Sequence, residues 1–186
     1  RQLCYREYGV RSGAPFFYCH GLPGSRRECE LLDSAAGKHG MRVIGIDRPG
    51  YGGSVARPGR TLRDWTGMVL ELADRLEIKR FGVIGISGGG PYALACARYL
   101  PERLTAVGVV CGLGPLHGTG LNAALHWHAR QVFRLAGMEA RGLLAVQGQA
   151  LCLAARFAPR AMVRSLGLLL GGEDRRELAR SETLDL

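Results

Sequence analysis

The residues best suited to chemistry lie in one glycine-rich segment, Gly85-Ile86-Ser87-Gly88-Gly89. An apolar run precedes it and a helix-like stretch follows it. The pattern therefore predicts a sharp turn between a strand and a helix, which lifts the Ser87 hydroxyl above the sheet edge. Such a serine can form a covalent acyl intermediate. The backbone N–H of Gly88, near the positive end of the following helix, would point into the same space. The alternative is a glycine-rich turn without chemistry.

A second candidate segment, His20-Gly21-Leu22-Pro23-Gly24-Ser25-Arg26, directly follows an earlier apolar run. A serine that attacks an acyl group needs a second donor to hold the developing oxyanion, and the backbone N–H of Leu22 is the candidate. We expect His20 to shape this loop rather than to act as a base. We expect Asp47, which also follows an apolar run, to order its own loop.

Three motifs together resemble those of the α/β-hydrolase family. They are H-G-x-P-G-S-R at residues 20–26, D-R-P-G-Y-G-x-S at residues 47–54 and G-x-S-G-G-G-P at residues 85–91. The resemblance covers most of residues 3–115 and implies a nucleophile at Ser87, with an oxyanion hole formed by the backbone of Leu22 and Gly88. It favours esterases, peptidases and thioesterases, because the similar epoxide hydrolases and haloalkane dehalogenases have an aspartate at the nucleophile position.

The sequence departs from the family pattern after its last predicted strand. In the family, the triad acid and histidine follow the serine along the chain, on loops after two further strands beyond the lid. No strand-like run follows Val110. The resemblance therefore predicts that this chain lacks those two strands and both triad partners. By itself it should be a poor catalyst, because a serine hydroxyl needs an oriented base.

Three histidines after Ser87 are the alternative sources of a base. They are His117, His126 and His128. We expect them to be ordinary loop and lid residues, with His117 the first candidate if one of them is catalytic. We expect Asp174 and Asp185 to be solvated helix positions rather than a triad acid.

The elements that must position these residues follow from the hydrophobic pattern. Short apolar runs alternate with longer helix-like stretches, which is typical of parallel strands joined by helices. The predicted strands are 16–19, 41–46, 81–86 and 104–110, with an antiparallel edge strand at 3–8 and helices at 61–78 and 90–100. The predicted fold class is α/β, with a mostly parallel α/β-hydrolase sheet whose final two strands are missing.

The predicted core, residues 1–117, is the N-terminal part of that fold, and residues 118–186 are predicted to form a helical cap or lid. Apolar residues recur at helical spacing in three stretches of the second region, 121–135, 143–157 and 162–170. Strand 104–110 would then be an exposed edge of the sheet. Because its apolar run carries no charge or proline, we expect self-association through this edge.

Composition excludes several other classes of protein. The chain has 25 Lys and Arg against 16 Asp and Glu, but no run of five like charges, so no nucleic-acid partner is predicted. The six cysteines include no C-x-x-C pair and lie mostly among apolar neighbours, which favours buried free thiols and a reducing cytoplasm. No apolar stretch reaches the roughly 18 residues of a membrane span. No cluster of His and carboxylates has metal-ligand spacing, so no metal or cofactor is predicted.

The predicted function is hydrolysis of an ester, thioester or amide bond through an acyl-Ser87 intermediate in the complete protein. The substrate would be a small molecule whose acyl part is apolar, because the cap that shapes the pocket has apolar faces. Transfer of the acyl group to an acceptor other than water would use the same site. The alternative is a non-catalytic truncated fragment that retains only a binding cleft.

Overall fold

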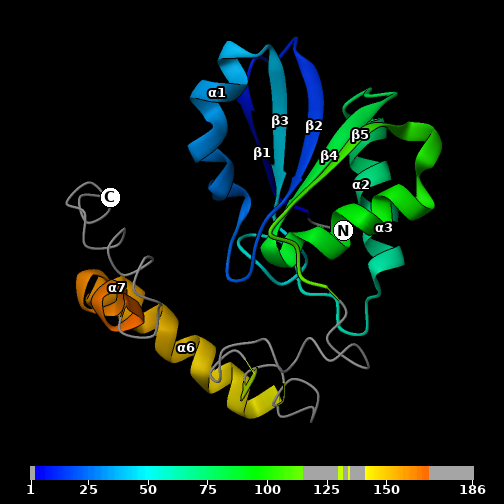
Figure 1. Ribbon diagram of the computed structural model, residues 1–186. Helices are drawn as coiled ribbons and strands as arrows, with labels where there is room; N and C mark the ends of the chain where they lie inside the picture. The colour runs from blue at the N-terminus through cyan, green and yellow to red at the C-terminus, as the bar shows by residue number, and fades with distance from the viewer. Residues whose placement is uncertain (1–2, 115–129, 132–133, 135–140, 168–186) are drawn as a thin grey trace. The chain divides into compact units, whose positions relative to one another are not determined.

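The computed structural model describes residues 3–114, 130–131, 134 and 141–167 (Figure 1). The chain divides into two compact units, Arg1–Pro115 and Leu116–Leu186. The first unit contains the sheet and all three sequence motifs. The predicted boundary after residue 117 lies outside the described residues and stays a prediction.

The first unit is built on a five-stranded sheet in the order β1-β3-β2-β4-β5. Its strands are β1 (Tyr5–Gly9), β2 (Ala14–Cys19), β3 (Met41–Ile46), β4 (Phe81–Ile86) and β5 (Leu104–Val110). β1 runs antiparallel to β3, and all other neighbouring strands are parallel. Each predicted strand is present, and β3, β4 and β5 have the predicted ends. The α/β fold class with a mostly parallel sheet is therefore confirmed.

Helices cover both faces of this sheet, as Figure 1 shows. The short helices η1 (Arg26–Leu32) and α1 (Asp33–Lys38) lie against β1 and β3, and α2 (Leu62–Arg75) and α3 (Gly90–Tyr99) cover the opposite face. The hydrophobic repeat predicted α2 and α3 to within three residues at each end. It did not reveal η1 and α1, because six or seven residues are too few to display a helical repeat.

Alternation along the strands divides the buried side chains into two clusters. Phe17 packs under α2 and α3 with Trp65, and its ring meets that of Phe81 edge-on at a centroid distance of 4.8 Å. The next residue along the strand, Tyr18, points to the other face, where it packs with Val43 under η1 and α1. Burial of each large side chain contributes about 1.5–3 kcal/mol, so both clusters hold the sheet in place beneath the functional loops.

The start of α2 is fixed by a cap at Thr61. The Thr61 hydroxyl accepts a hydrogen bond from the Asp64 N–H at 3.2 Å, and the Asp64 carboxylate accepts one from the Thr61 N–H at 2.7 Å. This reciprocal pair satisfies two donors that the helix end would otherwise leave free. It also ends the loop that leads from the second motif, residues 47–54, into the helix.

Two helices of the second unit are described, α6 (Arg141–Phe157) and α7 (Pro159–Gly167). They agree with the helical pattern predicted for 143–157 and for the start of 162–170. The remaining predicted stretch, 121–135, lies almost entirely outside the described residues. No helix in the part of the chain that the structure describes is long and apolar enough to cross a membrane.

The cysteines follow the sequence prediction only in part. All six are free, and Cys19, Cys29 and Cys96 are buried as expected. Burial raises the pKa of the Cys29 and Cys96 thiols to about 12. The prediction of burial is wrong for Cys111 and Cys152, which are exposed. Cys111 follows the edge strand β5 and Cys152 lies on an exposed face of α6, so apolar neighbours in sequence do not bury them.

Candidate active site

Ser87 lies at the sharp turn that the sequence predicts, where β4 ends and the 3-10 turn η2 (Ser87–Gly89) begins, just before α3. Its backbone φ of 50° is in the left-handed region, which is rare for a residue with a side chain and costs on the order of 1–3 kcal/mol. Glycine is needed beside it, because a Cβ at Gly89 would collide with the carbonyl oxygen of Cys19. Strand and helix therefore approach closely around a strained serine.

Ser87 and Leu22 line the same pocket, of about 350 Å³. The other residues that line it are Tyr18, Gly21, Pro23, Glu28, Leu31, Leu32 and Ile86. A Cβ placed on Gly88 would lie 3.3 Å from the Leu22 nitrogen, so the two candidate anion donors belong to touching segments. The structure thus brings together the three residues that the sequence singled out, although they come from loops more than 60 positions apart.

Hydrogen bonds to two carbonyl oxygens fix the orientation of the peptides that carry these donors. The Gly21 oxygen accepts bonds from Arg48 Nη2 at 2.6 Å and from His20 Nδ1 at 2.9 Å. The Ser87 oxygen accepts a bond from the Leu113 N–H at 3.1 Å. In a trans peptide the N–H points opposite to the C=O. The Leu22 N–H therefore points away from Arg48 and His20, and the Gly88 N–H points away from Leu113.

His20 is fully buried, and both of its ring nitrogens are occupied. The backbone N–H of Arg48 can only donate, so the His20 Nε2 that it contacts at 3.0 Å must be an acceptor. The ring proton is then on Nδ1, where it is donated to the Gly21 oxygen. Burial also lowers the pKa of His20, which favours this neutral form. The geometry agrees with the expectation that His20 shapes the loop and is not a base.

Arg48 is a residue whose importance the sequence did not reveal. Only 3% of it is exposed, and its guanidinium lies over the rings of Tyr51 and Tyr92, 4.7 and 4.8 Å from the ring centroids. It bridges the Gly21 oxygen and the Gly88 oxygen, the latter at 3.2 Å. No carboxylate in the described part of the chain forms an ion pair with it. Arg48 therefore couples the two loops that carry the candidate anion donors.

Asp47 orders its loop as expected and also ties it to the preceding one. Its carboxylate is fully buried and accepts the Gly53 N–H at 2.9 Å and the Arg26 N–H at 2.7 Å. The Arg26 guanidinium forms an ion pair with the same carboxylate. The Ser54 hydroxyl donates to the Asp47 carbonyl oxygen at 2.8 Å. Through Asp47, the loops after β2 and β3 form one hydrogen-bonded assembly.

Glu28 is a second residue that the sequence analysis missed. It lies on η1 and reaches back to the loop after β2, where its Oε2 accepts bonds from the Gly21 N–H at 3.0 Å and the Tyr18 hydroxyl at 3.1 Å. Burial, and secondarily the charge of Glu28, raises the pKa of Tyr18. No repeat or motif pointed to Glu28, since the seven-residue helix that positions it was not predicted.

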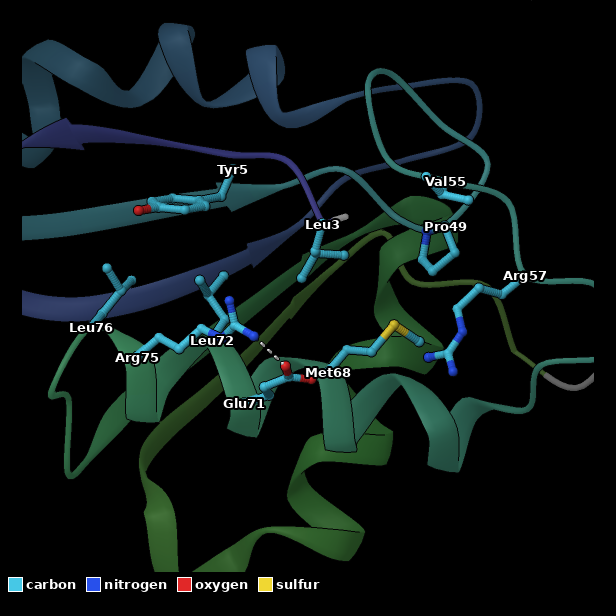
Figure 2. A pocket seen from close by; sticks show the side chains of 10 residues that line it. All are labelled: Leu3, Tyr5, Pro49, Val55, Arg57, Met68, Glu71, Leu72, Arg75 and Leu76. Atoms are coloured by element: carbon cyan, nitrogen blue, oxygen red, sulfur yellow. Dashed lines mark hydrogen bonds and ion pairs between the residues drawn. The ribbon is translucent and has the colours of Figure 1, made fainter. Parts of the chain in front are cut away.

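A larger cavity, of about 520 Å³, lies elsewhere in the first unit. Figure 2 shows it between the N-terminal segment, with Leu3 and Tyr5, and the side chains of α2, where the Glu71 carboxylate is paired with Arg75 at 2.8 Å. Neither Ser87 nor either candidate anion donor lines it. Ser87 and Leu22 line the smaller pocket instead.

The remaining candidates from the sequence lie outside the described residues. They are His117, His126, His128, Asp174 and Asp185. Within the residues that the structure describes, no group of three or more His, Cys, Asp or Glu side chains is arranged to hold a metal ion.

The sheet order, the strained serine between strand and helix, and the loop after β2 are features of one fold family. The family model of the α/β-hydrolase fold matches residues 14–163, which is most of the chain. The chain therefore belongs to the α/β-hydrolase family.

Named relatives agree with this assignment. The chain is 32% identical to the non-heme chloroperoxidase of Streptomyces lividans over 116 residues, which cover 61% of this chain and 42% of that protein. It is 32% identical to the proline iminopeptidase of Lactobacillus helveticus over 110 residues, which cover 55% of this chain and 37% of the relative. The chain thus spans less than half the length of these curated relatives.

Solved structures extend the comparison. The enol-lactonase from Burkholderia xenovorans superposes with a TM-score of 0.52 at 30% identity, over 56% of this chain and 41% of that one. A hydrolase from Pseudomonas aeruginosa matches with a TM-score of 0.60 at 24% identity, over 87% of this chain and 60% of that one. The second likeness shows a shared fold.

Proposed function

We propose that this chain carries the nucleophile and the oxyanion hole of a serine hydrolase, which cleaves an ester, thioester or amide bond through an acyl-Ser87 intermediate in the complete protein. The observation that carries the proposal is the left-handed backbone of Ser87 at the end of β4, in a pocket shared with Leu22. A strained serine at this junction exposes its hydroxyl to a bound acyl group.

The oxyanion hole in this proposal consists of the N–H groups of Leu22 and Gly88. Both peptides are held by their carbonyl oxygens before any substrate arrives, one by Arg48 and His20 and the other by Leu113. Donors that are fixed in advance need no reorganisation when negative charge develops. In other enzymes, loss of a single such donor lowers kcat by about 10²–10³.

In the proposed reaction, the Ser87 oxygen attacks the acyl carbon while a general base removes the hydroxyl proton. The tetrahedral intermediate collapses as the proton passes to the leaving alcohol, thiol or amine, and the acyl group stays on Ser87. Water activated by the same base then releases the carboxylic acid. Among the described histidines, His20 has no free nitrogen, and His39 precedes the start of β3, at the opposite end of the strands from Ser87. A histidine base must therefore come from outside the described residues.

The apolar part of the pocket wall supports a small substrate with an apolar acyl portion. Leu22, Leu31, Leu32 and Ile86 supply this wall. The relatives named above carry different activities in their names, so the family does not select among ester, thioester and amide. The same acyl-serine also permits transfer to an acceptor other than water.

Labelling with an alkyl fluorophosphonate tests the proposed nucleophile. We expect slow, stoichiometric addition of one phosphonyl group, located at Ser87 by mass spectrometry of peptides. The variant Ser87→Ala should not react, whereas the matched control Ser12→Ala, which changes an exposed turn serine, should react as the unchanged chain does. Equal labelling of Ser87→Ala would refute the assignment.

Turnover of an activated p-nitrophenyl ester tests whether a base is present in this chain. Without a base, residual rates of on the order of 10³ over water are expected from the oxyanion hole and binding alone. Turnover at the rate of a complete enzyme, abolished by both Ser87→Ala and His117→Ala, would instead identify His117 as the base. Absence of any Ser87-dependent rate would favour a non-catalytic fragment with a binding cleft.

A further inference from the structure

The side chain of Glu28 lies in the same pocket as the proposed nucleophile. A methyl group added to Gly21 would contact both, because its carbon would lie 3.6 Å from Glu28 Oε1 and 3.7 Å from Ser87 Cβ. Both residues line the 350 Å³ pocket. A substrate group bound at Ser87 in this pocket can therefore reach the Glu28 carboxylate.

The charge of Glu28 is not neutralised by an ion pair with any residue that the structure describes. The two arginines that precede it are engaged elsewhere, Arg26 with Asp47 and Arg27 with Glu30 at 3.8 Å. Arg48, the buried cation of the site, contacts the carbonyl oxygen of Gly21, whereas Glu28 contacts the N–H of the same residue. Oε2 accepts two hydrogen bonds, and Oε1 accepts none from the described part of the chain.

The rest of the pocket wall strengthens the effect of the Glu28 charge on which ligands bind. Apart from Glu28, the hydroxyl groups of Ser87 and Tyr18 and backbone atoms, the lining consists of aliphatic side chains, Pro23 and the ring of Tyr18. An apolar surrounding weakens the screening of a charge, so a carboxylate here attracts cations and repels anions more strongly than one in open water. A charge of this kind contributes mainly to discrimination between ligands.

We propose that Glu28 makes this pocket selective for substrates whose acyl part carries an organic cation, such as an ammonium group, next to a short apolar segment. As a statement about substrates this rests on the proposed function of Ser87, but as a statement about binding it stands alone. The cation would pair with Glu28 Oε1 while the aliphatic wall contacts the remaining carbons. An anionic acyl chain of the same size would be excluded.

Binding of a matched pair of probes, choline and its uncharged isostere 3,3-dimethylbutan-1-ol, tests the proposal without any catalysis. Titrations followed by the amide signals of Gly21 and Ser87 in ¹H–¹⁵N spectra give both dissociation constants. We expect choline to bind about tenfold more tightly, the effect of one partly screened charge pair. Salt raised from about 20 mM to about 1 M should shrink this preference.

Two variants on η1 distinguish the loss of the Glu28 charge from a general disturbance of the fold. Glu28→Gln keeps an oxygen that can accept the Gly21 N–H and should bind both probes equally. Glu30→Gln, which removes the carboxylate paired with Arg27, should keep the tenfold preference. No binding of choline, equal binding of both probes by the unchanged chain, or a preference that survives both high salt and Glu28→Gln would overturn the proposal. If the fluorophosphonate does not label Ser87 while the choline preference holds, the cation site is supported and the hydrolase function is refuted.

Discussion

The loops after β2 and β3 bury charged groups, whereas the edge strand β5 exposes apolar side chains. In the loops, charged groups are buried, with Asp47 fully inaccessible and Arg48 only 3% exposed. On β5, Val107, Val109 and Val110 are 38–49% exposed. Every carboxylate oxygen of Asp47 has a partner, whereas no strand in the described part of the chain pairs with the outer side of β5.

The difference shows which part of the first unit makes its contacts within that unit and which part needs something to cover it. Buried polar groups are stable when their hydrogen bonds are satisfied, and contacts from this unit alone satisfy both Asp47 carboxylate oxygens and two of the three guanidinium nitrogens of Arg48. An exposed strand edge with apolar side chains is stable only when something covers it, and it is a template for pairing with another chain. The loops should therefore respond to substitution through stability, and β5 through association.

The largest loss of stability is expected for Asp47→Asn. The amide keeps the size of the side chain but leaves the Arg26 guanidinium without its charge partner and adds two donors where only acceptors fit. We expect the free energy of unfolding to fall by about 2–3 kcal/mol, at the lower end for a broken ion pair because Arg26 is partly exposed. Urea unfolding followed by tryptophan fluorescence measures it, and a loss below 0.5 kcal/mol, on the order of a surface change, would contradict a tightly coupled loop assembly.

Arg48→Lys should have the next largest effect. A single ammonium keeps the charge but cannot reach the Gly21 and Gly88 oxygens together as the guanidinium fork does. One buried carbonyl loses its donor, at a cost of about 1–2 kcal/mol. The expected signature is a change in the amide signals of Leu22 and Gly89, whose N–H groups belong to the two peptides that Arg48 contacts, together with the lower stability. Unchanged signals at both residues would mean that Arg48 does not orient these peptides.

A smaller effect is expected at the other edge of the sheet, strand β1, where Glu7 pairs with Arg42 at 2.7 Å. The hydrogen bond from Arg42 holds the pKa of Glu7 below its ordinary value of 4.5. Because the folded-state pKa is lowered, the stabilisation is present above pH 4.5 and is lost as the pH falls through the folded pKa. Glu7→Gln should cost about 0.5–1 kcal/mol at neutral pH and nothing in strong acid. Urea unfolding at several pH values checks it, and a cost independent of pH would refute this account.

The smallest effect on stability is expected for Val110→Lys on β5. Val110 is 49% exposed, so the change should alter the free energy of unfolding by no more than about 0.5 kcal/mol. If the open edge drives self-association, the added charge should suppress it, as seen by light scattering at rising concentration. The control Val55→Lys, at a 57% exposed valine in a loop, should leave association unchanged. A chain that is monomeric before any substitution would mean that β5 is covered.

Local patterns predicted the scaffold well, because strands and long helices express a repeat over neighbouring residues. The ends of β3, β4 and β5 and the turn at Ser87 all follow from such patterns. The position of β5 at an edge came from the family resemblance. The shared pocket of Leu22 and Ser87 was predicted in outline, because parallel strands bring their carboxyl ends to the same edge.

The sequence could not predict the polar contacts that organise the site. Arg48 meets carbonyl groups 27 and 40 residues away, and nothing in the D-R-P-G motif specifies which oxygens these are. Glu28 resembles any solvated acidic residue until η1 turns its side chain back toward Gly21. Charged residues are normally expected at the surface, so their burial becomes visible only when the distant partners are placed.

The three buried thiols can report how often the packed core opens. A thiol reacts as its thiolate, and burial with a raised pKa suppresses that form at Cys19, Cys29 and Cys96. Cys111 and Cys152 are exposed and react without any opening. In an alkylation time course, the fast phase thus reports the surface. The slow phase measures how often the packing on each face of the sheet comes apart, since Cys29 lies on one face and Cys19 and Cys96 on the other.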